Sequence, residues 1–261
     1  MEAIEIKSVD DYLCEINKFE QQQIAQWIYR GQGNDNFDLI PSLFRIEIEK
    51  TFTDWEVLEK YMLNVFEREA RPFNEFQAKN EIELLSLAQH HGLPTRLLDW
   101  STNPLIALFF AVEDFKSNAE NSYVWCYGFP STNNCLPEST RIDRKLLLEK
   151  ENLIIFPAHI SPRITNQSAC FTVHDLPKGK EEFKAFNKSK TDGIFDLFII
   201  KKDFRKNILD QLYDLGYHYG LIYPGLDGIS KRIKYDAISF HSRKTNEKQL
   251  IRYNQKFNEK K

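Results

Sequence analysis

Apolar positions along this chain recur at helical spacing in several stretches. Over residues 54–71 they fall on one stripe at intervals of three and four, and Pro72 follows directly. The same intervals occur over residues 10–26 and 204–215, and more briefly over 229–235. Such intervals place side chains on one face of an α-helix. The pattern therefore predicts an amphipathic helix in each of these four stretches.

Other stretches alternate aromatic, β-branched and small residues, which is typical of strands. They comprise residues 27–29, 122–128, 153–156, 164–174 and 194–200. Turns and polar connectors rather than long helices separate the last four, which favours antiparallel or mixed pairing. We therefore predict a single α+β domain over residues 1–243, with a helical N-terminal half and a mixed or antiparallel sheet. A polar tail is expected over residues 244–261.

The segment 88–104 is the densest in reactive groups, with two His, an Arg, an Asp, a Trp and several hydroxyl and amide side chains. A helix is expected to end in it at Gly92, which suits the left-handed conformation that often closes a helix. Asn103 is expected to cap a second helix that begins at Pro104, because the missing proline N–H would be unpaired there anyway. Residues 95–100 are too few for a helix and are expected to form a brief extended segment.

This segment has two interpretations. A helix N-terminus carries unpaired N–H groups and a partial positive charge, so Ser101 and Thr102 stand where an anion can bind. Alternatively, the residues serve ordinary capping, with the two histidines at the end of the preceding helix and Arg96 and Asp99 as a surface ion pair. The sequence leaves both open.

Composition and charge narrow the class of protein. The 261 residues are 42% hydrophobic and 13% aromatic, enough for a sizeable core, and the formal net charge of −3 gives no overall attraction to nucleic acid. The four cysteines have no metal-ligand spacing, so we expect reduced structural thiols and no metal site. No stretch reaches the length of a membrane span, and no basic flank with an apolar run opens the chain. We therefore expect a cytoplasmic protein with no membrane partner.

Arg30 follows an aromatic and β-branched run, Trp27-Ile28-Tyr29, that predicts a strand. An arginine in such surroundings is unfavourable unless its guanidinium meets an anion, because an unpaired buried charge destabilises the fold strongly. Arg30 is therefore expected either to pair with a carboxylate of this protein or to bind a phosphate.

Four motifs occur in order along the chain: Tyr29-Arg30-Gly31, Pro41-Ser42-Leu43-Phe44-Arg45, residues 89–100 and residues 163–167. With these motifs the chain resembles the FRG domain family, named for its Phe/Tyr-Arg-Gly sequence. The resemblance extends over residues 20–240. The family has little established biochemistry, so the resemblance alone implies no particular activity.

The chain is also similar, more distantly, to arginine-type mono-ADP-ribosyltransferases. In these enzymes a strand ending in Tyr-Arg-Gly supplies the Arg that holds NAD, and a Ser-Thr-Ser segment before an Ala- and Phe-rich helix shapes the nicotinamide pocket. Tyr29-Arg30-Gly31 resembles the first element. Ser101-Thr102-Asn103 resembles the second, with Asn103 in place of the last Ser. The similarity implies an ADP-ribosyltransferase-like fold and NAD as a substrate.

The third element of those enzymes is a strand-borne Glu that favours the oxocarbenium-like state as nicotinamide leaves. The matching stretch, residues 164–172, has Gln167 instead. An amide can bond a ribose hydroxyl, but it carries no charge to stabilise a cationic transition state. Three possibilities follow. NAD or another ADP-ribose compound is bound with little turnover, a carboxylate from elsewhere such as Asp99 or Glu247 takes part, or another mechanism operates.

Together these observations assign a candidate site. Arg30 is expected to hold a phosphate or ribose, and Gln167 to contact the ribose. His91 is a candidate general acid or base because its ordinary pKa lies near neutrality, although a histidine at this position more often bonds a carbonyl at the helix end. The residues expected to bind the nucleotide are Tyr29, Gly31, Gln32, Arg96, Asp99, Trp100, Ser101 and Thr102.

The leading hypothesis is an NAD-using ADP-ribosyltransferase or NAD glycohydrolase whose acceptor is protein, nucleic acid or water. A bacterial toxin or phage-defence role is a further hypothesis. The main alternative is a module that binds a nucleotide, a phosphate or nucleic acid without chemistry, which the missing Glu favours. A purely structural domain would instead neutralise Arg30 and lack a polar cavity. A nuclease or hydrolase built on His91 and Asp99 ranks last, because no metal motif accompanies them.

Overall fold

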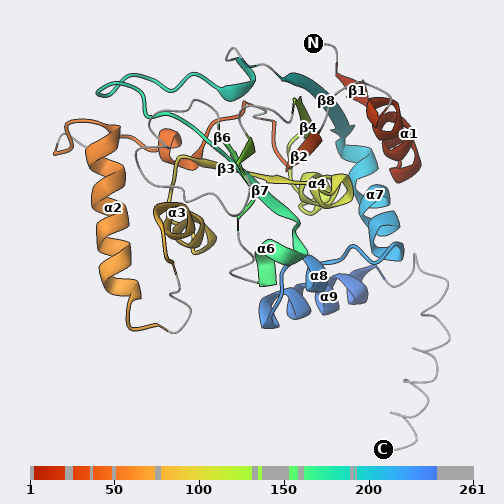
Figure 1. Cartoon of the computed structure of the whole chain (residues 1–261). Helices are drawn as coiled ribbons and strands as arrows, with labels where there is room; N and C mark the ends of the chain where they lie inside the picture. Colours follow the sequence, from red (N-terminus) through yellow and green to blue (C-terminus); the bar gives the residue numbers. More distant parts are fainter. Residues whose placement is uncertain are drawn as a thin grey trace, which may run out of the picture.

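A mixed sheet lies at the centre of the fold (Figure 1). The computed structural model describes residues 3–20, 26–35, 38–48, 51–73, 78–130, 135–136, 153–157, 162–188, 191 and 193–239. Its strands are β1 (Ile4–Glu5), β2 (Gln26–Gln32), β3 (Leu97–Ser101), β4 (Asn121–Phe129), β5 (Cys135–Leu136), β6 (Leu153–Ile155), β7 (Ala169–Val173) and β8 (Ile194–Lys201). The strand order is β1-β8-β4-β2-β3-β7-β6-β5. β1 with β8 and β5 with β6 are parallel, and the other neighbours are antiparallel. The predicted α+β class with a mixed sheet is confirmed.

The α-helices pack mainly against one face of the sheet, because the apolar cluster on the opposite face contains no α-helical residue. They are α1 (Val9–Glu20), α2 (Trp55–Ala70), α3 (Glu81–His90), α4 (Pro104–Val112), α6 (Pro162–Asn166), α7 (Lys202–Asp214), α8 (Tyr219–Ile222) and α9 (Leu226–Ile238). Two short 3₁₀ segments are η1 (Ser42–Arg45) and η2 (Phe186–Lys188). None of the helices in the described ranges combines the length and hydrophobicity needed to span a bilayer.

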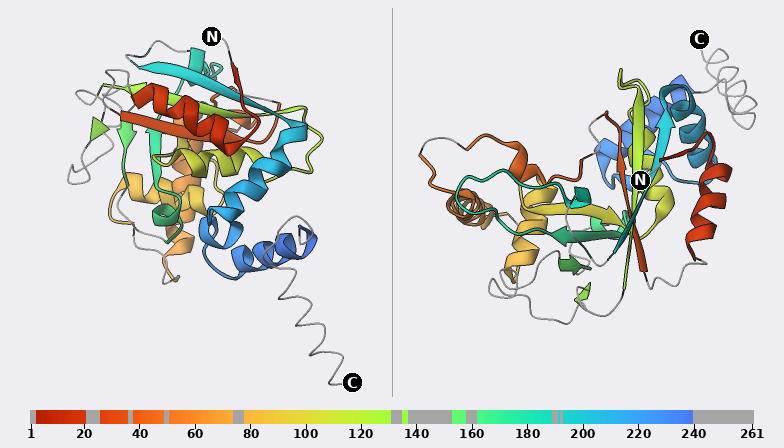
Figure 2. Two further views of the ribbon diagram at one scale, coloured as in Figure 1. Left: turned by 90° about the vertical axis from the view of Figure 1, so that its right-hand side faces the viewer. Right: turned by 90° about the horizontal axis from the view of Figure 1, so that it is seen from above.

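The sheet has two halves that meet between β2 and β3. In the view from above in Figure 2, β3 and β7 run across the direction of β2, β4 and β8. α1, α4 and α7 cover one face of the β2-β4-β8 half and form the largest buried core with it. α2 and α3 lie beside β3, β6 and β7, where a second apolar cluster includes Leu85 and Phe171. The candidate site lies at the junction of these halves.

The close approach of α4 to β2 depends on Gly31. A Cβ at this position would lie 1.9 Å from the main-chain oxygen of Ala107 and 2.6 Å from the main-chain nitrogen of Ala111. Any larger residue would therefore push α4 away from the strand. Close packing against α4 therefore explains why the Tyr-Arg-Gly motif ends in glycine. The same packing fixes α4 beside the site.

Most predicted helix ends are confirmed. The Asp54 side chain accepts a hydrogen bond from the N–H of Val57 at 2.8 Å and caps α2. Gly92 closes α3 with a φ of +88°, and the Asn103 side chain accepts from the N–H of Leu105 to cap α4, as predicted. The helix predicted over 229–235 is longer, because α9 already begins at Leu226.

The strand predicted over residues 164–174 is wrong in its first part. Residues 162–166 form α6, and β7 begins only at Ala169. Pro162 opens the helix, a position that proline favours because it needs no N–H partner there. Ser168 then turns the chain with a φ of +45°. The predicted tail over 244–261 and Glu247 lie outside the described residues.

Candidate functional site

A cavity of about 300 Å³ lies where β2 and β3 separate, between α3, α4 and α6. Its size is at the lower end of the range of small-molecule sites, roughly 300–1,000 Å³. Seven of the eleven predicted site residues line it, namely Tyr29, Arg30, Gly31, Asp99, Trp100, Ser101 and Gln167. The other four, Gln32, His91, Arg96 and Thr102, do not line the cavity.

Arg30 lies at the point where the two strands part. β2 and β3 pair at Tyr29 and Ser101, and their described residues form no further pair beyond it. Nη1 of Arg30 donates a hydrogen bond to the main-chain oxygen of Asp99 at 2.6 Å, so the side chain joins the strands in place of the backbone. Its Nε is buried and has no partner among the described residues. Part of the donor capacity of this guanidinium therefore remains unused.

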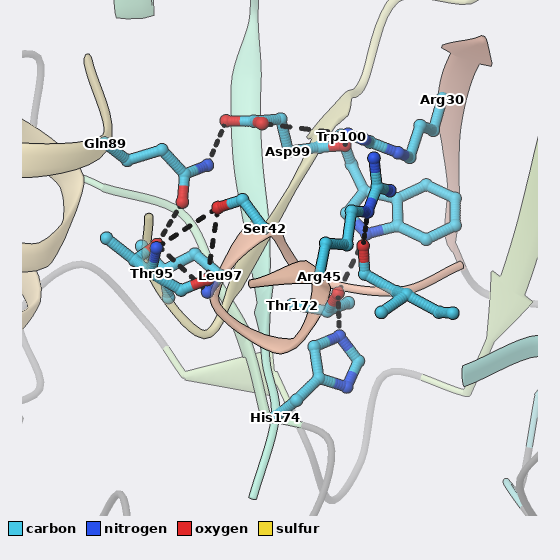
Figure 3. A network of polar contacts seen from close by, with 11 residues as sticks. Arg30, Ser42, Arg45, Gln89, Thr95, Leu97, Asp99, Trp100, Thr172 and His174 are labelled. Atoms are coloured by element: carbon cyan, nitrogen blue, oxygen red, sulfur yellow. Dashed lines mark hydrogen bonds and ion pairs between the residues drawn. The ribbon is translucent and has the colours of Figure 1, made fainter. Parts of the chain in front are cut away.

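The Asp99 carboxylate belongs to a polar network between α3 and β3 (Figure 3). Its Oδ1 accepts from Nε2 of Gln89 at 2.6 Å, while its Oδ2 lies 3.7 Å from Nη1 of Arg30. The hydroxyl of Thr95 donates to Oε1 of Gln89 and so fixes the orientation of the amide. The Asp99 side chain is 61% exposed.

The distance between Asp99 and Arg30 and the exposure of Asp99 decide whether this carboxylate neutralises the guanidinium. An ion pair with one exposed partner contributes about 0–1 kcal/mol. A hydrogen bond to a charged group contributes more, roughly 1.5–3 kcal/mol. A phosphate that bonds the guanidinium directly can therefore replace Asp99 as its counterion. The sequence predicted that Arg30 either pairs with a carboxylate of the protein or binds a phosphate. In the structure it bonds a main-chain carbonyl instead of a carboxylate, and it still lines the cavity.

The hydroxyls of Ser101 and Thr102 are used within the fold. The Ser101 hydroxyl donates to the main-chain oxygen of Gln167 at 2.7 Å and accepts from the N–H of Asn103 at 3.0 Å. The Thr102 hydroxyl donates to the main-chain oxygen of Ser168 at 3.4 Å. These contacts hold the turn after α6 against the start of α4, which is a positioning role.

Gln167 lies in this turn and not on a strand. Its Nε2 donates to the main-chain oxygen of Ile222 at 3.0 Å, and Nδ2 of the neighbouring Asn166 donates to the oxygen of Leu221 at 2.8 Å. Both amides therefore bind the C-terminal end of α8, where main-chain oxygens are unpaired. Gln167 lines the cavity with one side while its nitrogen anchors α8.

Trp100 borders the cavity through β3, but its ring packs in the apolar cluster on the other face of the sheet, near Tyr127 and Phe186. Its indole Nε1 donates to the hydroxyl of Thr172 at 2.9 Å, which in turn bonds Nε2 of His174 at 2.8 Å (Figure 3). Burial lowers the pKa of His174 to about 3, with a smaller contribution from Arg30, so this ring is neutral. Trp100 is therefore a core residue at the cavity floor.

The surface ion pair expected between Arg96 and Asp99 is wrong. Arg96 is buried, its side chain 1% exposed, and it pairs with Glu59 of α2, which is 3% exposed. Glu59 lies 37 residues before Arg96, too distant in sequence to be predicted as its partner. Gln32 lies farther along β2 than the cavity and is also buried. Neither side chain is placed to contact a ligand in the cavity.

Of the two adjacent histidines, His90 and not the predicted His91 lies at the cavity. His91 is the exposed C-cap of α3, where its N–H bonds main-chain oxygens of the last turn. His90 lines the cavity instead. Burial lowers the pKa of His90, and the positive charge of Arg163 and the nearby His91 lower it further. His90 is therefore a neutral imidazole at pH 7, able to donate and accept hydrogen bonds.

Sequence reasoning missed two charged residues of the lining, Arg163 of α6 and Glu113 directly after α4. Arg163 belongs to the 163–167 motif, so this motif could have marked it as a candidate site residue. Its guanidinium lies 5.2 Å from the ring centroid of Tyr223, and no described acid lies within ion-pair distance of it. Glu113 lies outside all four motifs, so no signal in the sequence marked it as a site residue.

Glu113 is held by a tyrosine. The hydroxyl of Tyr223 bonds its two carboxylate oxygens at 2.8 and 2.9 Å. Burial raises the pKa of Glu113, whereas the Tyr223 hydrogen bond and the charges of Lys231 and Arg163 oppose this shift. The cavity therefore contains two guanidinium groups, one exposed carboxylate at Asp99 and one buried carboxylate whose charge is disfavoured. No group of metal-ligating side chains occurs within the ranges that the structure describes.

Part of the chain matches the model of a known protein family. Residues 25–120 match the sequence model of the FRG domain family. This stretch runs from β2 to the turn before β4, so it contains Arg30, α3, Asp99 and α4 but not Arg163 or Gln167. The predicted resemblance to the FRG family is confirmed over these residues. No curated protein and no solved structure matches the chain.

Proposed function

We propose that the cavity binds a nucleotide through its phosphate groups, and that NAD or a related ADP-ribose compound is the ligand. The carrying observation is that Arg30 and Arg163 line one cavity. The nearest carboxylate oxygen to Arg30 is 3.7 Å away, and none of the described acids pairs with Arg163. A guanidinium matches the oxygens of a phosphate in geometry and charge. Two guanidinium groups in one cavity suit the two phosphate groups of a diphosphate.

The remaining lining supports a nucleotide rather than an inorganic anion. Tyr29 and Phe110 supply ring surface, and His90 supplies a neutral hydrogen-bonding group for a sugar hydroxyl. Small-molecule sites commonly combine apolar walls with a few polar groups in this way. The volume of about 300 Å³ accommodates part of a dinucleotide, whose remainder extends outward.

A second candidate function is cleavage of NAD, as an ADP-ribosyltransferase or NAD glycohydrolase. In this reaction the bond between ribose C1′ and the nicotinamide nitrogen breaks, nicotinamide leaves with the electron pair, and the ADP-ribosyl group passes to protein, nucleic acid or water. Gln167 supplies no negative charge for the cationic sugar. The observation that favours this candidate is the presence of Asp99 and Glu113 in the cavity. A toxin or phage-defence role depends on such turnover.

Two measurements on the full chain separate these candidates. Calorimetric titration with NAD and with ADP-ribose measures binding, and chromatography of the incubated mixture measures released nicotinamide. Saturable binding without release supports the binding module. Release that Glu113→Gln or Asp99→Asn abolishes, while NAD binding persists, supports the enzyme. Absence of both binding and release at high NAD concentration overturns the proposal. Arg71→Ala, an exposed arginine beyond α2, serves as the control variant.

A further inference from the structure

Arg163 and Glu113, a base and an acid, line the same cavity without forming an ion pair. Burial raises the pKa of Glu113, and the positive charge of Arg163 opposes this rise, so the two groups are close enough to interact. Opposite charges attract each other more strongly as the distance between them falls. Another group must therefore hold these two side chains apart.

Tyr223 contacts both side chains, each through a different part of its own. Its hydroxyl donates to the two carboxylate oxygens of Glu113, at 2.8 and 2.9 Å. Its ring lies against the Arg163 guanidinium, 5.2 Å from the ring centroid, which is within the range of a cation–π contact. The preferred pairing of a guanidinium with a carboxylate is bidentate, and it needs both carboxylate oxygens to face the guanidinium. In this structure both oxygens face the Tyr223 hydroxyl instead.

The backbone before Tyr223 is fixed to both sides of the cavity. Gln167, directly after α6, donates from its amide to the main-chain oxygen of Ile222 at 3.0 Å, which ties α8 to α6 beside it (Figure 1). The hydroxyl of Tyr219 donates to the main-chain oxygen of Glu113 at 2.6 Å, which ties α8 to the end of α4. These contacts hold Tyr223 between the helix that contains Arg163 and the residue that it orients.

A second cation compensates Glu113 from outside the cavity. Lys231 of α9 lines a separate hollow of about 430 Å³, to which Glu113 and the neighbouring Asp114 also contribute. Its ammonium lies 4.4 Å from the ring centroid of Tyr223. Burial and the charge of Asp114 raise the pKa of Glu113, whereas the Tyr223 hydrogen bond and the charge of Lys231 lower it. Glu113 therefore has other support for its charge and does not depend on Arg163 as a partner.

We propose that Tyr223 is a positioning residue that keeps Glu113 away from Arg163 and so leaves this guanidinium free to bind a ligand phosphate. The inference rests on the proposed nucleotide site. Tyr223 is not among the described residues that line the cavity, so it acts on the ligand through the two charged groups that it contacts. Without its hydroxyl, the Glu113 carboxylate turns to Arg163, and a phosphate has to break this ion pair before it binds.

Calorimetric titration of the full chain with ADP-ribose tests the proposal. Tyr223→Phe keeps the ring against Arg163 and removes only the hydroxyl, so it is expected to raise the dissociation constant roughly threefold to tenfold. Tyr223→Phe with Glu113→Gln is expected to recover the affinity of Glu113→Gln alone, because a neutral amide forms no ion pair with Arg163. Tyr219→Phe is the matched control, since its hydroxyl bonds the main chain of Glu113 and not the carboxylate. This control is expected to bind as the unchanged chain does.

Urea denaturation tests the same separation of charges without a ligand. Arg163→Ala is expected to lower the urea midpoint by a larger amount in the Tyr223→Phe background than in the unchanged chain, because only there does it break an ion pair with Glu113. Equal shifts in the two backgrounds, unchanged affinity in Tyr223→Phe, an equal loss in Tyr219→Phe, or no recovery by Glu113→Gln overturns the proposal. Absence of ADP-ribose binding to the unchanged chain overturns the nucleotide site instead, and the denaturation comparison then decides the role of Tyr223.

Discussion

Arg30 and Asp99 are joined through the main chain rather than through their charges. The guanidinium donates to the Asp99 carbonyl at 2.6 Å, while the nearest carboxylate oxygen is 3.7 Å away. The same side chain thus ties β2 to β3 where their backbones part and keeps its charge largely available. Arg30 therefore has a structural role that can be measured apart from the ligand-binding role proposed for it.

Arg30→Ala is expected to lower the free energy of unfolding by about 1–3 kcal/mol, because the hydrogen bond from its charged guanidinium to the Asp99 carbonyl is lost. Arg163→Ala is the comparison, since the described residues give the Arg163 guanidinium a ring contact with Tyr223 but no hydrogen bond or ion pair. Its loss is expected to stay below about 1 kcal/mol. Urea denaturation measures both. Equal destabilisation by the two variants would show that Arg30 is no tie between the strands.

Gly31→Ala is expected to destabilise the fold by about 3 kcal/mol, because the new Cβ overlaps main-chain atoms of α4 and cannot be relieved by a side-chain rotation. Gly33→Ala is the matched control, since its nearest contact would be the Ala111 oxygen at 3.5 Å, an ordinary separation. Thermal unfolding of both variants checks this. A Gly31→Ala protein as stable as the Gly33→Ala protein would contradict the close packing of α4 on β2.

Glu59→Gln is expected to lower the free energy of unfolding by about 3–5 kcal/mol, because it leaves the buried Arg96 guanidinium without its acid. Replacing both partners with apolar residues, Glu59→Leu with Arg96→Met, is expected to cost less than the single change. Glu67→Gln removes the exposed pair with Arg71 and should change stability by less than about 1 kcal/mol. A loss no larger in Glu59→Gln than in Glu67→Gln would rule out a structural role for the pair.

His174 makes stability depend on pH. Its folded pKa of about 3 lies below the ordinary value of 6.5, so the unfolded chain binds the extra proton between these values. Stability from this group is complete above pH 6.5 and is lost as the pH falls toward 3. The expected loss from pH 7 to pH 5 is about 2 kcal/mol. In His174→Gln this part of the dependence should disappear, and parallel stability curves for the two proteins would refute it.

The features that could be predicted from the sequence are those that depend on residues close together in the chain. The capping of α4 and the end of α3 depend on neighbours in sequence, and they were predicted from Asn103 and Gly92. Residues 164–166 were mistaken for the start of a strand because α6 is short and the amides of Asn166 and Gln167 bind α8, 55 residues farther along. The partner of Arg96 and the place of Glu113 depend on contacts between distant elements. Arg30 was found because a charged residue in an apolar strand needs a long-range explanation.

The central claim is that the cavity holds nucleotide phosphates on Arg30 and Arg163. Calorimetric titration of ADP-ribose into the unchanged chain and into Arg163→Ala tests it most directly, because this variant is expected to keep its fold. The account predicts saturable binding to the unchanged chain and a dissociation constant raised roughly tenfold to a hundredfold in the variant. Equal affinity of the two proteins, or no binding to the unchanged chain, would contradict it.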